Sequence, residues 1–173
     1  MVGYQHADEA AAAELIRRLS PSLMRFLSGP VYTRAEAEDL LQDCWLRIHR
    51  ARHTYRPGDP VLPWVYAIAR HTRVDAFRRR RRIEWHEVRL EPLPDFPAPA
   101  EAAQDVDLSR WINALPERQR EVILMLKFSG MSLEEVARAT SSSVGAVKQK
   151  AHRAYGNLRA LLDSASPVRV RRK

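Results

Sequence analysis

The side chains with the clearest chemical potential in this sequence are basic. Five consecutive arginines, Arg78–Arg82, follow an apolar, helix-like segment in the stretch VDAFRRRRRIEWHE. Adjacent like charges repel one another, so either solvent screens them or a polyanion neutralises them. The run is therefore either a solvated helix end or a contact with nucleic acid.

The surroundings of the arginine run favour a nucleic-acid contact. Arg70, His71 and Arg73 lie at the wetter positions of the same helical pattern, and Tyr55 and Trp64 belong to the preceding loop and the start of the helix. Aromatic rings can stack on bases while basic side chains neutralise phosphates. The sequence therefore predicts a contact with a nucleic-acid groove or strand.

Metal and catalytic sites are weaker interpretations. His49 and His53 are four residues apart and Cys44 precedes them, but no carboxylate or second cysteine completes a ligand set. Cys44 lies on an apolar helical face beside Trp45 and is interpreted as a core residue. No nucleophile–base pair or glycine-rich phosphate loop is recognisable. We therefore expect no enzyme activity, metal, cofactor or small-molecule substrate.

The composition points to a basic protein of the cell interior. The chain has 173 residues, enough for one domain or two small ones. Lys and Arg number 29 against 21 Asp and Glu, which gives a formal charge of +8 and suits a polyanionic partner. The single cysteine excludes an internal disulfide and favours a reducing cytoplasm. No segment has the apolar length of a membrane span or the layout of a signal peptide.

The charge is distributed in three parts. Residues 1–83 carry 15 basic and 9 acidic side chains, residues 84–107 carry 1 and 7, and residues 108–173 carry 13 and 5. The acidic part contains EPLPDFPAPAE, whose alternate prolines remove backbone donors and favour extended conformations. We therefore expect two basic lobes joined by an acidic, proline-rich and flexible linker.

The apolar periodicity of the first lobe is helical throughout. We expect one helix over residues 10–27, bent or split at Pro21, and a second over AEAEDLLQDCWLRIHRA. Thr33 and Glu36 have the spacing of a capping box that starts the second helix. The stretch HTYRPGDPVLP is too rich in Pro and Gly for regular structure, so it is predicted as a loop that ends where Pro63 opens the next helix.

The second lobe reads as four helices, the third of which starts at a capping box from Ser132 to Glu135. The last two are joined by the polar turn TSSS, and the final helix is basic on its outward face. Two helices with a tight turn and a basic second helix are typical of a helix-turn-helix that places the second helix in the major groove. A helical hairpin with a solvated basic face is the alternative.

Together these segments resemble an extracytoplasmic-function (ECF) RNA polymerase sigma factor, the group 4 class of the sigma-70 family. The resemblance rests on AEAEDLLQDCWLRIHRA, PWVYAIARHTRVDAFRRRRR, LPERQREVILM and SLEEVARATSSSVGAVKQKAHRAYGNLRALL, in this order. It implies an all-α fold of two small helical domains: region 2 over residues 8–83 and region 4 over 107–163. The linker would cover 84–106, and a basic tail would cover 164–173.

The resemblance also implies partners and site residues. Core RNA polymerase, through its largest and second-largest catalytic subunits, would bind the second helix, at Glu36, Glu38, Asp39, Gln42, Asp43 and Arg47. Promoter DNA at the −10 element would be melted and its flipped base captured by the loop and the basic helix, at Tyr55, Arg56, Trp64, Arg70, His71, Arg73, Asp75, Arg78, Arg79, Arg80, Arg81 and Arg82. The −35 element would be read by Ser143, Lys148, Gln149, Lys150, His152 and Arg153.

Five positions depart from the pattern of the family. His71 stands where Asn is frequent, which alters the surroundings of the flipped base. The turn has Thr140 to Ser142 in place of apolar anchors, and Ala146 replaces a threonine that contacts phosphate. We therefore expect the second lobe to bind its element more weakly than in relatives with those residues.

The resemblance further implies an anti-sigma factor that covers the polymerase-docking and DNA-reading faces. Two other functions fit parts of the sequence. An autonomous helix-turn-helix regulator would explain the second lobe only. A sigma mimic that sequesters an anti-sigma factor would have no reason to keep the basic surfaces of either lobe.

Overall fold

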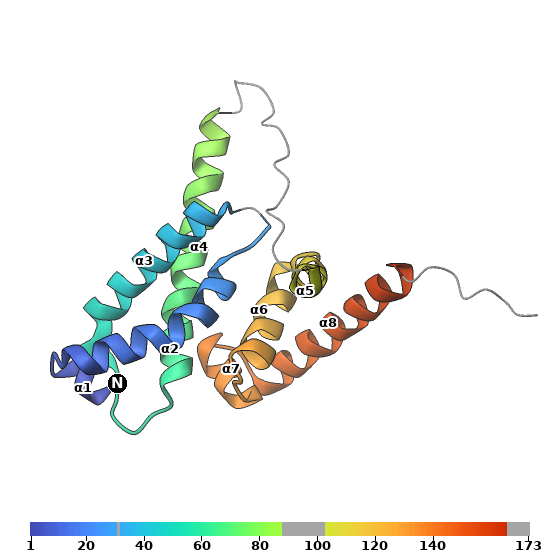
Figure 1. The fold of residues 1–173 in the computed structure, drawn as a ribbon. Coiled ribbons are helices and arrows are strands. Elements are labelled where there is room, and N and C mark those ends of the chain that lie inside the picture. The colour runs from blue at the N-terminus through green and yellow to red at the C-terminus, as the bar shows by residue number, and fades with distance from the viewer. Residues whose placement is uncertain (31, 88–102, 166–173) are drawn as a thin grey trace, which may run out of the picture.

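The computed structural model describes residues 1–30, 32–87 and 103–165, and all regular secondary structure in these ranges is helical. Figure 1 shows α1 to α4 forming one lobe and α5 to α8 forming a second lobe beside the first half of α4. The predicted all-α fold of two helical domains is confirmed. Most of the predicted linker and most of the basic tail lie outside the described residues.

The first lobe contains α1, α2, α3, a short 3-10 turn and α4. The capping box predicted at the start of α3 is present: the backbone N–H of Thr33 donates to Oε2 of Glu36 at 2.7 Å, and the N–H of Glu36 donates to Oγ1 of Thr33 at 3.2 Å. The elements span Val2–Gln5 (α1), Glu9–Leu27 (α2), Arg34–Ala51 (α3), Arg52–Thr54 (the 3-10 turn) and Val61–Glu87 (α4).

Two proline predictions for this lobe need correction. Of the two outcomes predicted at Pro21, a bend or a split, the split is wrong, because α2 continues through this residue. Helix α4 begins at Val61, so Pro63 is its third residue and not its first. The early N–H groups of a helix have no intrahelical acceptor, so a proline in the first turn costs little.

The second lobe has the four predicted helices and one additional π-helical turn. Ser132 caps α7, because its hydroxyl accepts from the N–H of Glu135 at 3.1 Å while the Glu135 carboxylate accepts from the N–H of Ser132 at 2.8 Å. The elements span Ala103–Asn113 (α5), Glu117–Ile123 (α6), Leu124–Phe128 (the π-helical turn), Leu133–Ala139 (α7) and Val144–Ala165 (α8).

The two lobes share one apolar core. Phe26 and Tyr66 of the first lobe belong to the same buried cluster as Val122, Met125 and Val136 of the second. The rings of Phe26 and Tyr66 meet edge to face with centroids 5.0 Å apart. Burial of this apolar surface stabilises the contact between the lobes. The second lobe therefore lies against α2 and α4, where the sequence alone predicts only a flexible connection.

Cys44 is fully buried in the first lobe, which confirms its interpretation as a core residue. Burial raises the pKa of its thiol to about 12, so the side chain stays a thiol at neutral pH. In the described part of the chain, no three His, Cys, Asp or Glu side chains are grouped as metal ligands. No helix within those residues has the length and apolarity needed to cross a membrane.

Candidate nucleic-acid interface

The predicted arginine run lies along the second half of α4. Arg78, Arg79, Arg81 and Arg82 are exposed, while Arg80 is partly covered and contacts Oε1 of Glu36 at 3.3 Å. Figure 1 shows this end of α4 projecting beyond the other helices of its lobe. Successive residues of an α-helix point in different directions, so these guanidinium groups surround the projecting end of α4 and can meet phosphates on more than one side of it.

A groove of about 780 Å³ lies between α4 and α6 at the base of this run. Its walls carry six arginines and two glutamates, contributed by both lobes. The lining charged residues are Arg70, Arg73, Arg78, Arg81, Arg82 and Arg118, with Glu117 and Glu121. We call this feature the arginine groove.

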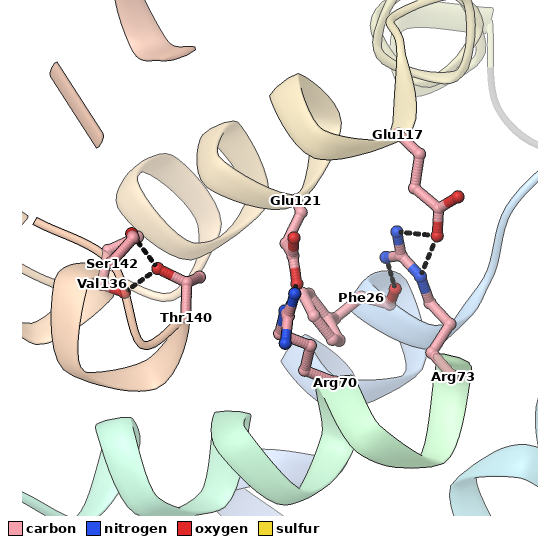
Figure 2. Close-up of polar contacts among 8 residues, drawn as sticks. All are labelled: Phe26, Arg70, Arg73, Glu117, Glu121, Val136, Thr140 and Ser142. Atoms are coloured by element: carbon pink, nitrogen blue, oxygen red, sulfur yellow. Dashed lines mark hydrogen bonds and ion pairs between the residues drawn. The ribbon is translucent and has the colours of Figure 1, made fainter. Parts of the chain in front are cut away.

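Arg73 joins the two lobes at one end of the arginine groove. Its Nε and Nη2 donate to Oε1 of Glu117 at 3.3 and 2.9 Å, and its Nη1 donates to the backbone oxygen of Phe26 at 3.1 Å. The guanidinium also lies 5.1 Å from the ring centre of Phe26. Figure 2 shows Arg73 of α4 reaching toward Glu117 of α6. With its side chain only 5 % exposed, Arg73 is directed into the interface and away from solvent.

A second arginine of α4 makes a parallel contact. Nε of Arg70 lies 2.9 Å from Oε1 of Glu121, a residue that is itself nearly buried. The contact is an ion pair without hydrogen-bond alignment, because Nε of Arg70 has no hydrogen-bond partner among the described residues. Figure 2 shows both glutamates on the side of α6 that faces α4.

Arg120 comes between these two glutamates in the sequence of α6 and is buried as well. Burial lowers the pKa of its guanidinium, and the neighbouring positive charge of Arg73 lowers it further. Its Nη2 would lie 3.1 Å from a β-carbon at Gly29, so the glycine leaves room for the guanidinium. Three arginines and two glutamates therefore form a charged contact between the lobes.

This contact changes how two predicted DNA residues must be interpreted. Arg70 and Arg73 are engaged by α6, whereas the exposed members of the arginine run lie beyond the contact. His71 is exposed on α4, and Asp75 accepts from Nη1 of Arg47 at 2.7 Å. In this arrangement Arg73 has no access to DNA, so DNA contact by Arg73 requires the lobes to separate.

The predicted base-capture loop is held by its own side chains. Tyr55 is buried, its hydroxyl donates to the backbone oxygen of Asp59 at 2.5 Å, and its ring centre lies 5.8 Å from that of Trp64. Nε1 of Trp64 donates to Oγ1 of Thr54 at 3.1 Å. A cavity of about 260 Å³ lies against these residues, with the exposed Arg56 also on its wall. Tyr55 thus forms part of the framework of a small pocket and is not a free stacking platform.

The residues predicted to bind polymerase lie on α3. Glu38, Asp39 and Gln42 are exposed, and Glu38 accepts from Nε of Arg34 at 3.1 Å. Glu36 belongs to the capping box, and the hydrogen bond from the Thr33 backbone is the main cause that lowers the pKa of its carboxyl. These side chains form an acidic N-terminal half of α3.

The other two members of the predicted set, Asp43 and Arg47, lie nearer α4. Nε of Arg47 donates to Oδ2 of Asp43 at 3.1 Å, and the same guanidinium holds Asp75 of α4. The hydrogen bond from Arg47 lowers the pKa of the Asp75 carboxyl, and the same contact raises the pKa of Arg47. The structure therefore connects one residue predicted to bind polymerase with one predicted to bind DNA.

Helices α7 and α8 form the predicted helix-turn-helix, and the polar turn between them satisfies its own hydrogen bonds. The Thr140 hydroxyl donates to the Val136 backbone oxygen at 2.8 Å and lies 2.7 Å from Oγ of Ser142 (Figure 2). Ser141 has a φ of 49°, the left-handed conformation that reverses the chain. The turn therefore uses hydroxyl groups where the family pattern uses apolar anchors.

The predicted −35 residues lie on α8 and its cap. Ser143 accepts from the N–H of Ala146 at 3.2 Å, so its hydroxyl is used by the helix start. The other members are exposed or partly exposed along the helix, while Val147 and Ala151 on the opposite side are buried. The outward set is Lys148, Gln149, Lys150, His152 and Arg153.

Reasoning from the sequence missed the acidic partners on α6. Glu117 and Glu121 are four residues apart and therefore lie on one side of a helix, which is the signal that could have marked them. It also missed Gln5, whose amide contacts the loop before α4. The spacing of the glutamates does not show which helix they contact, and no pattern in the sequence marks Gln5.

Comparison with known proteins identifies both lobes. Residues 15–83 match the sigma-70 region 2 family, and residues 105–158 match the sigma-70 region 4 family. The RNA polymerase sigma factor CarQ of Myxococcus xanthus is 34 % identical, over 94 % of this chain and 95 % of CarQ. The ECF RNA polymerase sigma factor RpoE of Cereibacter sphaeroides is 32 % identical, over 89 % of this chain and 87 % of that protein.

Solved structures share the fold. The sigma factor RpoE of Bartonella quintana, determined in complex with the anti-sigma factor NepR, superimposes with a TM-score of 0.74 at 24 % identity, over 90 % of this chain and 99 % of that one. CnrH, determined with the cytosolic domain of CnrY, gives a TM-score of 0.69 at 25 % identity, over 95 % and 96 % of the two chains. The order of the two matched regions, the nearly full-length relatives and the shared helical fold agree with the resemblance inferred from the four motifs. The chain belongs to the ECF family of RNA polymerase sigma factors.

Proposed function

We propose that this chain binds core RNA polymerase and directs it to promoters, reading a −10 element with region 2 and a −35 element with region 4. The observation that carries the proposal is the succession of the two regions in one chain, each with its own basic helical surface. An autonomous helix-turn-helix regulator would use α7 and α8 but would give no role to the acidic half of α3 or to the arginines of α4.

Polymerase docking is assigned to the exposed acidic half of α3. Glu38, Asp39 and Gln42 are exposed there, so a basic surface of the polymerase catalytic subunits can approach them without a change in the fold. Arg47 has a second role, because its bond to Asp75 fixes α3 relative to α4, while its bond to Asp43 stays within α3. The helix that binds polymerase, α3, and the helix that contacts the promoter, α4, would then keep a fixed orientation relative to each other.

Promoter opening is assigned to α4 and the loop before it. Arg78, Arg79, Arg81 and Arg82 supply phosphate contacts, and the pocket beside Trp64 accepts an unstacked base. The energy lost in unstacking the base is offset by these contacts. His71, exposed on the same helix, is positioned to influence which base is preferred.

Region 4 reads the −35 element as a duplex through the outward side of α8. Lys148, Lys150 and Arg153 can neutralise phosphates, and Gln149 can pair with a base edge in the major groove. The region boundaries that we propose are residues 8–83 and 107–163, with 164–173 as a basic tail.

We further propose that the closed arrangement of the lobes belongs to the chain before it binds polymerase. Arg70 and Arg73 contact Glu121 and Glu117 in this arrangement, and the buried Arg73 can contact the −10 element only after α6 moves away. Two fold relatives were determined with an anti-sigma factor or with the cytosolic domain of CnrY. A cytoplasmic anti-sigma segment that binds both lobes is therefore the expected regulator.

The test is transcription with the purified full-length chain, bacterial core polymerase and a library of genomic DNA, followed by mapping of RNA 5′ ends. We expect start sites at defined distances from shared −10 and −35 sequences. A chain that binds operator duplex without polymerase, and adds no start site in its presence, would instead be an autonomous regulator.

A further inference from the structure

The N-terminal helix α1 contacts the loop that is proposed to capture the flipped base. Nε2 of Gln5 donates to the backbone oxygens of Arg52 and Tyr55, each at 2.7 Å. These acceptors lie 47 and 50 residues away in the sequence, at the two ends of the 3-10 turn that begins the loop. One amide group therefore uses both of its donors to hold one segment.

Helix α1 is itself fixed to the rest of the lobe. Tyr4 is buried, and its hydroxyl lies 3.0 Å from Nδ1 of His49 at the end of α3. A β-carbon at Gly3 would lie 2.9 Å from that of Ala11, so α1 approaches α2 at a distance that only glycine permits. Gln5 is thus presented to the loop from a packed helix.

The segment that Gln5 holds leads directly into the candidate pocket. Thr54 lies between the two acceptors and receives the hydrogen bond from Nε1 of Trp64. Tyr55, the second acceptor, donates its hydroxyl to the backbone oxygen of Asp59. The loop is thus held by hydrogen bonds of its own aromatic residues and by the hydrogen bonds from Gln5 of α1. Without the amide, the oxygens of Arg52 and Tyr55 would lose these hydrogen bonds.

From this geometry we propose that Gln5 is a positioning residue for base capture. It does not touch the base; it holds the loop backbone in the conformation that shapes the pocket, so that less conformational entropy is lost when the base enters. The inference rests on the proposed function of the loop. It extends the working part of the protein to residues before the matched region 2, which begins at residue 15.

The decisive variant is Gln5→Glu, which keeps the shape of the side chain but presents carboxylate oxygens to the two carbonyl oxygens. His6→Ala is the control, because His6 is exposed at the next position and its ring bonds back to α1, to the Val2 oxygen at 2.9 Å, and not to the loop among the described residues. Both variants are assembled with core polymerase as the full chain. Circular dichroism and polymerase affinity are measured first to verify folding and docking.

The assay uses forked DNA probes built from a promoter mapped with the wild-type chain, with a single-stranded −10 segment. An abasic site is moved through that segment one nucleotide at a time. For the wild type, one position is expected to give the largest loss of affinity, which identifies the captured base. On the intact probe, Gln5→Glu is expected to bind about ten-fold more weakly, because the released loop must then be ordered when the base enters.

Combining the Gln5 substitution with the abasic probes distinguishes a positioning role from a general loss of stability. If Gln5 positions the pocket, its substitution has little further effect when the captured base is absent, so the ten-fold loss disappears on that abasic probe. An equal loss on every probe, or wild-type binding by Gln5→Glu, would overturn the inference while leaving the proposed function intact. If the wild-type assembly shows no mapped start site, the proposed function itself has failed.

Discussion

Arg73 and Glu117 pair across the contact between the two lobes, with Nη2 of the arginine 2.9 Å from Oε1 of the glutamate. The arginine is buried in α4, while the glutamate lies half exposed at the start of α6. A group predicted to bind DNA phosphate is therefore paired with a carboxylate of the same chain. If Arg73 binds promoter DNA as proposed, DNA and region 4 compete for this guanidinium.

Removal of the competing carboxylates is expected to strengthen binding of single-stranded DNA. In Glu117→Gln/Glu121→Gln, both Arg70 and Arg73 lose their charged partners, the contact between the lobes weakens, and both arginines become able to neutralise phosphates when the lobes separate. With two additional phosphate contacts, the slope of log affinity against log salt should become steeper by about 1.4. Fluorescence anisotropy with a labelled oligonucleotide measures this slope.

The charge-matched control for that experiment is Glu134→Gln/Asp163→Asn. Both residues are exposed in the second lobe, on α7 and α8, away from the arginine groove. Equal slopes for the two double variants would show that total charge matters and the pairing does not.

The hydrogen bond between Tyr66 and Ser129 provides a test of lobe packing in solution. Their hydroxyl oxygens lie 2.5 Å apart, Tyr66 is fully buried, and burial raises the pKa of its phenol. We expect Tyr66→Phe and Ser129→Ala each to lower the free energy of unfolding by about 1 kcal/mol. In urea unfolding the double variant should be less destabilised than the sum, because both changes remove the same bond. Strict additivity would mean that the lobes do not pack in this way.

Exposed arginines of α4 should be required for promoter opening but not for polymerase binding. Arg78→Ala/Arg79→Ala removes two charges that can reach duplex phosphates, so the salt slope of promoter binding should flatten by about 1.8. Permanganate reactivity of the melted strand should fall while affinity for core polymerase stays the same. Arg17→Ala/Arg18→Ala is the control, since these adjacent arginines are exposed on α2 and pair with Glu14. Unchanged opening by the α4 variant would contradict the assignment.

The polar turn of the helix-turn-helix should depend on its hydroxyl groups. Thr140→Val keeps the shape of the side chain but removes the donor to the Val136 oxygen and the contact with Ser142. Because the site is buried, we expect a loss of about 1 kcal/mol in the free energy of unfolding. Ser141→Ala is the comparison, since its side chain is exposed in the same turn. A more stable Thr140→Val protein would mean that apolar contacts, as in the family pattern, suit this turn better.

The pairing of Asp75 with Arg47 should make a pH-dependent contribution to stability. Hydrogen bonding lowers the pKa of Asp75 in the folded chain below its unfolded value near 3.8. The stabilisation is therefore present above the unfolded pKa and is lost as the pH falls through the folded pKa. We expect Asp75→Asn to be less stable than wild type at pH 7, with the difference shrinking below about pH 4. Urea unfolding at several pH values measures it, and a constant difference would exclude the charged pair as its cause.

The sequence by itself determined most of the helices and the starts of α3 and α7, but it missed α1 and the start of α4. The capping boxes at Thr33 and Ser132 join residues three apart, and apolar periodicity depends on neighbours within one or two turns. Four motifs in the correct order were sufficient to indicate the family. The prediction that Cys44 is a core residue was also correct, because a residue on the apolar face of a helix is buried whichever element packs against that face.

Only the tertiary structure decided how the charged residues are used. The sequence marks Arg70 and Arg73 as basic positions of α4 but cannot show that α6 would cover them. The partners Arg73 and Glu117 are 44 residues apart, Tyr66 and Ser129 are 63 apart, and Gln5 lies 50 residues before one of its acceptors. Such pairs depend on the angle and register at which helices dock, which are set by the shared apolar core and by no local pattern. An arginine that the sequence predicts to bind DNA can therefore form a contact between the lobes in the structure.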